Sequence, residues 1–494
     1  TVEGEVVDEH TDRTGFRTFY ADPEKGFFLN GRHVKIKGVC SHQDFGLTGK
    51  AVSDNVHRYK VELIKEMGAN GYRTSHYPQS EALMDALDEA GFIVMDETRW
   101  FSSAPEHMAE LAMLVKRDRN RPSVFFWSVG NEEFVFTTDQ GRRIAASMMA
   151  LVGKLDPTRP VTAACDRPDR ATIYDDVDVI GVNYNLQHFD MLHAHFPDKA
   201  IFSSENCATG TTRGWYSDDD PAHGYISAYD AIPRGTGFMA RELTWRFIAE
   251  RDWIMGGYQW IAFEHRGETV WPRLCSQSGA IDLFLQKKDA FWQNRSHWTT
   301  EPMVHILPHW NLRGREGEPI RVSVYTNCAS VGLFLNEKPL GVHEIEPYGH
   351  AEWTVPYAPG KLEAVGYRDG APVCADTRET TGRAVRLCLS CDNPEDLTGN
   401  GRNVVFFTCT CLDAEGREVP DAAAKVRFAV NHCGIIAATG SDVSDHTPLS
   451  SLTRRMRAGR ITVAVRMAKT EAGDTFRLYA ESDTLESGSI ALQM

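Results

Sequence analysis

The chain has 494 residues, of which 53 are Lys or Arg and 68 are Asp or Glu, giving a formal net charge of −15. This acidic balance argues against nucleic-acid binding, which requires basic surfaces that neutralise phosphates. Hydrophobic residues make up 42% of the chain and charged residues 24%, as in ordinary globular proteins. No run approaches the ~18 apolar residues of a membrane span, so no membrane partner is expected.

The cysteines and the first residues bear on the cellular compartment. Eleven cysteines in so long a chain are too sparse for a disulfide scaffold and favour reduced, buried thiols. The opening residues have neither a basic stretch nor an apolar segment, so no signal peptide is predicted. We therefore expect a cytoplasmic protein, with a periplasmic or secreted location as the alternative. Cys388 and Cys391 precede Cys409 and Cys411, but residues three apart on a strand face opposite sides, which disfavours a zinc site.

Between residues 34 and 302, short apolar runs alternate with segments of helical periodicity. Strands are predicted at 34–39, 92–95, 124–128, 161–164, 179–182, 200–203 and 257–261, helices at 54–67, 81–90 and 139–155, and βα loops at 47–52 and 209–237. With the segment 71–76, the pattern fits eight strand–helix units in the ~250 residues of a closed (β/α)₈ barrel better than an open sheet. No Gly-x-Gly-x-x-Gly follows the first strand, so no dinucleotide cofactor is predicted.

Beyond residue 303, short alternating runs follow one another without helices. Strands are predicted at 320–325, 331–335, 361–365, 404–407 and 461–465. Such spacing is typical of β-sandwiches, and the length fits two of them with a boundary near 380–383. The predicted fold is α/β: a (β/α)₈ TIM barrel at 34–302, followed by two all-β immunoglobulin-like sandwich domains at 303–383 and 384–494. Residues 1–33 form the linker that precedes the barrel.

Two carboxylates stand immediately after predicted barrel strands. Glu132 ends one apolar run and Glu205 ends another, 73 positions further along. A closed barrel brings the carboxyl ends of its strands to one face, where barrel enzymes keep their sites. Glycosidic cleavage requires two such carboxylates, one to protonate the leaving oxygen and one to attack or to activate water. The alternative for either residue is a helix cap or a solvated loop position.

Several segments match a known family in order along the whole chain. They are Arg73-Thr-Ser-His-Tyr-Pro78, Trp127-Ser-Val-Gly-Asn-Glu132, Phe202-Ser-Ser-Glu205, Gly257-Tyr-Gln-Trp260 and, further on, Pro308-His-Trp-Asn311 and Asp413-Ala-Glu-Gly-Arg-Glu-Val-Pro420. On these motifs the chain resembles glycoside hydrolase family 2, the family of β-galactosidases, β-glucuronidases and β-mannosidases. The later segments are similar to the C-terminal domains of its large β-galactosidase-like members.

The resemblance implies roles for individual residues. Glu132 matches the acid/base and Glu205 the nucleophile of a retaining mechanism. Asn131 matches a residue that binds the sugar 2-hydroxyl, while Arg73 and Tyr184 match partners of the nucleophile. The other substrate-binding positions implied are His42, His76, Asp96 and Trp260. Glu97, Trp215 and Trp271 are further candidates, for which burial or loop packing is the alternative.

The resemblance also implies the reaction: exo-acting hydrolysis of terminal β-linked sugars from oligosaccharides or glycoconjugates. β-Glucuronidases hold the sugar carboxylate with an Asn-x-Lys where this chain has Ser276-Gln-Ser278, so galactose is expected. A β-uronidase that uses Lys287 or Lys288 is one alternative, and a non-catalytic carbohydrate-binding or scaffold protein is another. The family's magnesium-binding Glu-x-His is replaced by Glu97-Thr-Arg-Trp100, so neither metal nor cofactor is expected. A homo-oligomer is possible.

One departure concerns the beginning of the chain. Family members carry a jelly-roll domain and a complete sandwich ahead of the barrel, whereas here residues 1–22 resemble only the last strand of that sandwich. We therefore expect the natural protein to be longer.

Overall fold

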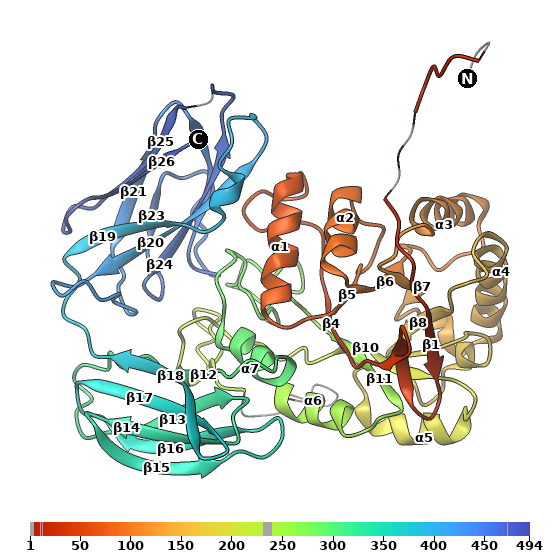
Figure 1. Ribbon diagram of the computed structural model, residues 1–494, viewed down its shortest axis with the longest axis horizontal. Helices are drawn as coiled ribbons and strands as arrows, with labels where there is room; N and C mark the ends of the chain where they lie inside the picture. The colour runs from red at the N-terminus through yellow and green to blue at the C-terminus, as the bar shows by residue number, and fades with distance from the viewer. Residues whose placement is uncertain (1–3, 10, 12, 231–239, 472) are drawn as a thin grey trace. The chain divides into compact units, whose positions relative to one another are not determined.

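The computed structural model describes residues 4–9, 11, 13–230, 240–471 and 473–494 (Figure 1). The chain divides into two compact units. The first comprises Thr1–Gly38, Asn70–Glu205 and Arg251–Tyr258, and the second comprises Val39–Ala69, Asn206–Glu250 and Gln259–Met494. Part of the predicted loop 209–237, its residues 231–237, lies outside the described residues.

Eight strands close into a parallel barrel in the order β10-β11-β4-β5-β6-β7-β8-β9. Their bounds are β4 (Ile36–Cys40), β5 (Gly71–Arg73), β6 (Ile93–Glu97), β7 (Val124–Asn131), β8 (Val161–Cys165), β9 (Ile180–Asn183), β10 (Ile201–Asn206) and β11 (Ile254–Gln259). Almost every residue of these strands is buried, as expected for strands with helices outside and packed side chains inside. The prediction of a (β/α)₈ barrel is confirmed.

Helices follow the barrel strands along the chain. They are α1 (Asp54–Glu66), α2 (Glu81–Ala90), α3 (Pro105–Asp118), α4 (Asp139–Leu155), α5 (Phe189–His195), α6 (Arg241–Ala249) and α7 (Asp289–Trp298), with short 3₁₀ turns η1 (Phe134–Thr137), η2 (Thr172–Asp175) and η3 (Leu186–His188). The predictions at 54–67, 81–90 and 139–155 agree with α1, α2 and α4. Helix α2 begins after Ser80, whose hydroxyl accepts the Leu83 N–H, and ends at the left-handed Gly91.

Helices α3, α5, α6 and α7 were not predicted, and α7 shows why. Eight of its ten residues are buried, among them the polar Gln293 and Asn294. A helix buried nearly all round has no polar face, so it lacks the periodicity on which sequence-based prediction relies.

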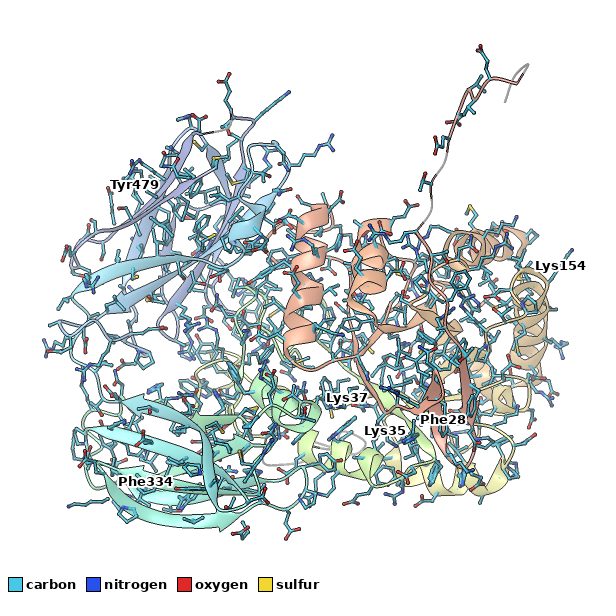
Figure 2. The ribbon with its side chains drawn as sticks, in the orientation of Figure 1. Phe28, Lys35, Lys37, Lys154, Phe334 and Tyr479 are labelled. Atoms are coloured by element: carbon cyan, nitrogen blue, oxygen red, sulfur yellow. The ribbon has the colours of Figure 1, made fainter. Side chains whose placement is uncertain are left out.

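A small antiparallel sheet of β1 (Phe19–Asp22), β2 (Gly26–Leu29) and β3 (Arg32–His33) precedes the barrel. The buried Phe27 packs against Phe125 and Phe126 at the start of β7, with ring centroids 5.7 and 5.8 Å apart. Lys35, which is labelled together with Phe28 in Figure 2, donates to the carbonyl of Ile254 at the start of β11. The sheet therefore lies at the amino-terminal ends of the barrel strands, opposite the ends that bear the predicted site.

Strands β12 to β26 form two pairs of antiparallel sheets. The first pair is β12-β13-β16 and β15-β14-β17-β18, and the second is β19-β20-β24-β22 and β23-β21-β25-β26. The bounds of the first are β12 (Val304–Leu307), β13 (Pro319–Thr326), β14 (Ser330–Leu335), β15 (Lys338–Glu344), β16 (His350–Pro356), β17 (Lys361–Arg368) and β18 (Ala371–Glu379). Those of the second are β19 (Arg386–Cys391), β20 (Val404–Leu412), β21 (Lys425–Val430), β22 (Gly434–Gly440), β23 (Thr453–Arg455), β24 (Arg460–Met467), β25 (Thr475–Glu481) and β26 (Gly488–Gln493).

Each pair of sheets encloses its own hydrophobic core. Trp310, Val322 and Leu333 belong to the first core, and Phe407 and Phe476 to the second. In Figure 2, the label Phe334 lies on β14 of the first pair of sheets and the label Tyr479 on β25 of the second. The prediction of all-β domains after the barrel is confirmed.

Candidate active site

Glu132 and Glu205 stand at the carboxyl ends of β7 and β10. Glu132 follows the last residue of β7 and has the left-handed φ of 55°, while its N–H donates to the carbonyl of Ala164 on β8 at 2.8 Å. The carbonyl of Glu205 accepts the N–H of Tyr184, which directly follows β9, at 2.7 Å. Pairing between neighbouring strands thus fixes the position of both backbones.

Arg73, at the end of β5, is fully buried and connects four strand ends. Its Nη1 donates to Oε1 of Glu205 at 2.6 Å, and its Nη2 donates to Oδ1 of Asn131 at 2.8 Å. Its Nε and Nη2 also donate to Oε2 of Glu97, at 3.0 and 2.8 Å. The planar guanidinium therefore orients both carboxylates at once through nitrogens held in a fixed fork, whereas a lysine offers a single nitrogen.

Glu97, at the end of β6, is the second carboxylate partner of Arg73. Its Oε1 accepts a hydrogen bond from Nδ1 of His76 at 2.7 Å, and its Oε2 accepts one from the hydroxyl of Ser128 at 2.7 Å. Burial opposes ionisation of this carboxyl, but the charge of Arg73 and the bond from His76 prevail and lower its pKa to about 2. His76 also brings Nε2 to 3.8 Å from Oε1 of Glu205.

Glu205 accepts hydrogen bonds at both carboxylate oxygens. Arg73 reaches Oε1, and the phenol of Tyr184 donates to Oε2 at 2.7 Å. The side chain of Glu205 is almost entirely buried. These bonds hold the carboxylate in one orientation, as a nucleophile requires.

Glu132 has a different environment from that of Glu205. Asn183 donates from Nδ2 to Oε1 of Glu132 at 2.8 Å, and its own Oδ1 accepts the hydroxyl of Ser204 at 2.6 Å. Burial, followed by the negative charge of Glu205, raises the pKa of Glu132 to about 7, although the bond from Asn183 acts in the opposite direction. A carboxyl group with a raised pKa beside a second carboxyl group is the usual basis of an acid and nucleophile pair.

Asp96 does not join this cluster. Thr74 donates to its Oδ1 at 3.0 Å, and its carboxyl faces Asp118 at the end of α3. Burial and the neighbouring Asp118 raise the pKa of Asp96 well above its usual range. Because successive residues of a strand face opposite sides, Asp96 faces outwards and Glu97 faces the barrel interior.

His42 and Trp260 belong to the second unit, where they lie together. Their rings are 5.7 Å apart, and His265 contributes a third ring at 4.4 Å from His42 and 5.8 Å from Trp260. The indole N–H of Trp260 donates to Oε2 of Glu268 at 2.9 Å. The structure thus brings Arg73, His76, Asn131, Glu132, Tyr184 and Glu205 together in one unit, and His42 with Trp260 in the other.

Sequence reasoning assigned no role to four of the polar residues around these groups: Ser128, Asn183, His265 and Glu268. Asn183 had a signal, since it directly follows the strand predicted at 179–182. Trp215 donates its indole N–H to the carbonyl of Asp218, and Trp271 is 78% exposed beside the ring of His446.

The two lysines considered for a sugar carboxylate already have partners. Lys288 donates to Oε1 of the buried Glu264 at 2.9 Å, and the same oxygen accepts a hydrogen bond from Arg273. Lys287 contacts both carboxylate oxygens of Glu66 at 2.5 and 2.6 Å.

Among the described residues, one group has the spacing of metal ligands: His432, Cys433 and Asp474, with donor atoms within 4.8 Å of one another. It lies in the turn after β21 and just before β25, not on the strands that carry Glu132 and Glu205. None of the eleven cysteines, all of which lie among the described residues, forms a disulfide. In the described part of the chain no helix is both long and apolar enough to cross a membrane.

A closed (β/α)₈ barrel with two carboxylates at the carboxyl ends of its strands, one of them with a pKa near neutrality, has the architecture of the barrel glycosidases. The family described as "Glycosyl hydrolases family 2, TIM barrel domain" matches residues 23–109 and 102–206, and "Glycoside hydrolase family 2 C-terminal domain 5" matches residues 387–491. A domain of unknown function, DUF4982, matches residues 317–374. The chain belongs to glycoside hydrolase family 2.

Relatives extend over most of the chain. "Beta-galactosidase BoGH2A" of Bacteroides ovatus is 32% identical over 88% of this chain and 58% of its own length. A "Putative beta-glucuronidase" of Formosa agariphila is 31% identical over 86% of this chain and 45% of its own length. The solved structure of a β-glycosidase from Bacteroides vulgatus matches all of this chain with a TM-score of 0.90, 28% identity and 68% coverage of that chain. The chain thus spans only about half the length of the two curated relatives.

Proposed function

We propose that this chain carries the catalytic barrel of a retaining, exo-acting β-glycosidase that acts on neutral sugars, with galactose as its preferred glycone. The observation that carries the proposal is the pairing of two unlike carboxyl groups. Glu205 is oriented by Arg73 and Tyr184, whereas the pKa of Glu132 is raised to about 7. The substrate would be an oligosaccharide or glycoconjugate with a terminal β-linked sugar.

In the first step, Glu205 attacks the anomeric carbon and the glycosidic C–O bond breaks. Glu132 donates its proton to the departing oxygen, so the leaving group departs as a neutral alcohol. A carboxyl group whose pKa is about 7 retains a proton on a large fraction of molecules at neutral pH. Asn131, fixed by Arg73, would bind the 2-hydroxyl, a contact that strengthens in the transition state.

In the second step, water attacks the glycosyl–enzyme ester. Esterification removes the charge of Glu205, one of the causes that raise the pKa of Glu132, so this pKa falls and Glu132 acts as a base. Glu132 takes a proton from the water, the bond between the anomeric carbon and Glu205 breaks, and the free sugar keeps its original anomeric configuration.

The preference for a neutral glycone rests on the two candidate lysines. A sugar carboxylate enclosed in protein needs a cationic partner. Lys288 and Lys287 already pair with Glu264 and Glu66, and the segment 276–278 contains no cation. A β-uronidase remains the second candidate, favoured by the relative named as a putative β-glucuronidase.

The test is hydrolysis of a matched pair of chromogenic substrates, the β-galactoside and the β-glucuronide of 4-nitrophenol, with Glu205→Gln as the inactive control. Turnover of the galactoside alone, lost in Glu205→Gln, supports the proposal. Turnover of the glucuronide alone overturns the galactosidase proposal and supports a β-uronidase. If Glu205→Gln keeps the activity of the unaltered chain, Glu205 is not the nucleophile.

Retention is tested separately. Proton NMR identifies the anomer released first, and β-galactose is expected. Glu132→Ala should recover turnover of an activated aryl galactoside when azide is added, with β-galactosyl azide as the product, because azide needs no general base. An α-azide would indicate inversion instead.

A further inference from the structure

A large apolar side chain lies exposed just beyond the acid/base. Phe134 is two residues after Glu132 and is 81% exposed, more than any other phenylalanine in the described part of the barrel that follows β4. A ligand that covered this ring would gain the free energy of burying it.

The turn that carries Phe134 is firmly anchored. Phe136, two residues further on, is 1% exposed and packs edge-on against Phe101 with ring centroids 4.9 Å apart. Thr138 then caps α4, its hydroxyl accepting the N–H of Gly141. Phe136 within η1 and Thr138 directly after it fix this turn, and Phe134 at its first position stays outside the core.

One face of Phe134 has a cationic partner from the next strand. The guanidinium of Arg167, in the loop after β8, lies 4.7 Å from the ring centroid. The preceding residue, Asp166, is close enough to Glu132 for its charge to contribute to the raised pKa. Arg167 thus contacts Phe134 from the loop whose Asp166 acts on Glu132, and most of the aromatic ring stays open to solvent.

We infer that Phe134 is the platform for the leaving group and that this group is a sugar ring, so that the substrate is at least a disaccharide. This inference rests on the proposed function. The acid must touch the glycosidic oxygen, so the first ring beyond that oxygen begins next to Glu132. The glycone binds on the buried side of the site, at Glu205 and Arg73. The exposed aromatic ring of Phe134, beyond Glu132, contacts the leaving group. An apolar face of a pyranose covers the aromatic ring that the fold leaves open.

The test compares two β-galactosides that differ only in the leaving group: methyl β-galactoside, whose leaving group has no ring to stack on Phe134, and lactose, whose leaving group is a glucose ring. Phe134→Ala should lower kcat/KM for lactose by roughly fivefold to tenfold and leave methyl β-galactoside within about twofold, whereas Phe134→Trp should retain the lactose activity. Phe16→Ala is the matched control. Phe16 is fully exposed, and its neighbour Gly15 packs against Pro122 just before β7, at the opposite end of that strand.

A second readout uses the same subsite in the reverse direction. Glucose added as an acceptor attacks the glycosyl–enzyme: Glu132 takes its hydroxyl proton, the bond to Glu205 breaks and a new glycosidic bond forms. With 4-nitrophenyl β-galactoside as the donor, Phe134→Ala should reduce the ratio of disaccharide to free galactose about fivefold. Because this is a ratio of products, a general loss of active enzyme does not change it.

The outcomes separate the inference from the proposed function. Equal losses on lactose and methyl β-galactoside, with an unchanged product ratio, overturn the role of Phe134 while the glycosidase stands. If the unaltered chain hydrolyses neither galactoside, the galactose assignment fails first. The effect of Phe134→Ala is then compared on methyl β-glucuronide and on a β-glucuronyl disaccharide. Equal effects on both substrates overturn the role of Phe134 as the platform for the leaving group.

Discussion

Arg73 Nη1 lies 2.6 Å from Oε1 of Glu205, with both side chains almost completely buried. The same guanidinium also holds Glu97 and Asn131, so one cation connects the groups expected to attack the sugar and to bind its 2-hydroxyl. The site is therefore built as a network around Arg73, and its parts should not respond independently to substitution.

The first prediction concerns Arg73 itself. Arg73→Lys retains the charge but cannot donate to Glu205, Glu97 and Asn131 together, so kcat should fall about 10²-fold while the protein still folds. The rate of covalent labelling by a 2-deoxy-2-fluoro galactoside should fall in parallel. Circular dichroism establishes that the variant is folded. A wild-type labelling rate in a folded variant would contradict the positioning role.

The second prediction separates two neighbouring carboxyl groups. Asp96→Asn should keep near-normal activity, because its carboxyl lies between Thr74 and Asp118 and has a raised pKa, so the neutral amide is a close substitute. Glu97→Gln should cost about 10²-fold in kcat/KM, because Arg73 and His76 both lose a charged partner. Equal effects of the two changes would mean that the orientation of β6 side chains does not decide function.

These two residues also show how far sequence reasoning reaches. The motifs located Glu132 and Glu205, and the repeated strand–helix pattern predicted the barrel that brings them to one face. The pattern did not indicate which of Asp96 and Glu97 faces inwards, because β6 is buried on both sides and its residues are uniformly apolar up to these two. Periodicity distinguishes faces only where one of them is polar.

Other parts of the fold left little trace in the sequence for related reasons. Strand β15 is exposed along almost its whole length, so it lacks the alternation that identifies a half-buried strand. Asn183 is buried and acts through hydrogen bonds to Glu132 and Ser204. Its role depends on partners from β7 and β10, which no local pattern places beside it.

The third prediction concerns pH. Glu132 must be protonated to act as an acid and its pKa is about 7, so kcat/KM for a poor leaving group such as methanol should fall tenfold per unit as the pH rises beyond this value. The bond from Asn183 lowers this pKa. Asn183→Ala should therefore move the alkaline limb of the kcat/KM profile to higher pH. A shift to lower pH would contradict the assignment of that limb to Glu132.

The last prediction concerns the loop that follows the Glu205 strand. Arg213 donates from Nε to Oδ2 of the buried Asp282 at 2.7 Å, and from its other nitrogens to the carbonyls of Ser441 and Ala458 in the C-terminal β-domain. Burial raises the pKa of Asp282 even though Arg213 opposes this. Arg213→Ala leaves that carboxylate without its cation, which should lower the free energy of unfolding by about 3 kcal/mol near pH 8.

The loss should depend on pH with a definite sign. Without Arg213 the pKa of folded Asp282 rises further above its unfolded value of ~3.9, so the folded state binds the proton more tightly. The deficit should therefore grow from pH 5 to pH 8, as measured by urea unfolding. Arg251→Ala is the control, since its partner Asp190 is largely exposed and its loss should cost less than about 1 kcal/mol. A deficit of equal size at both pH values would mean that Arg213 contributes through packing and carbonyl bonds and not through the charge of Asp282.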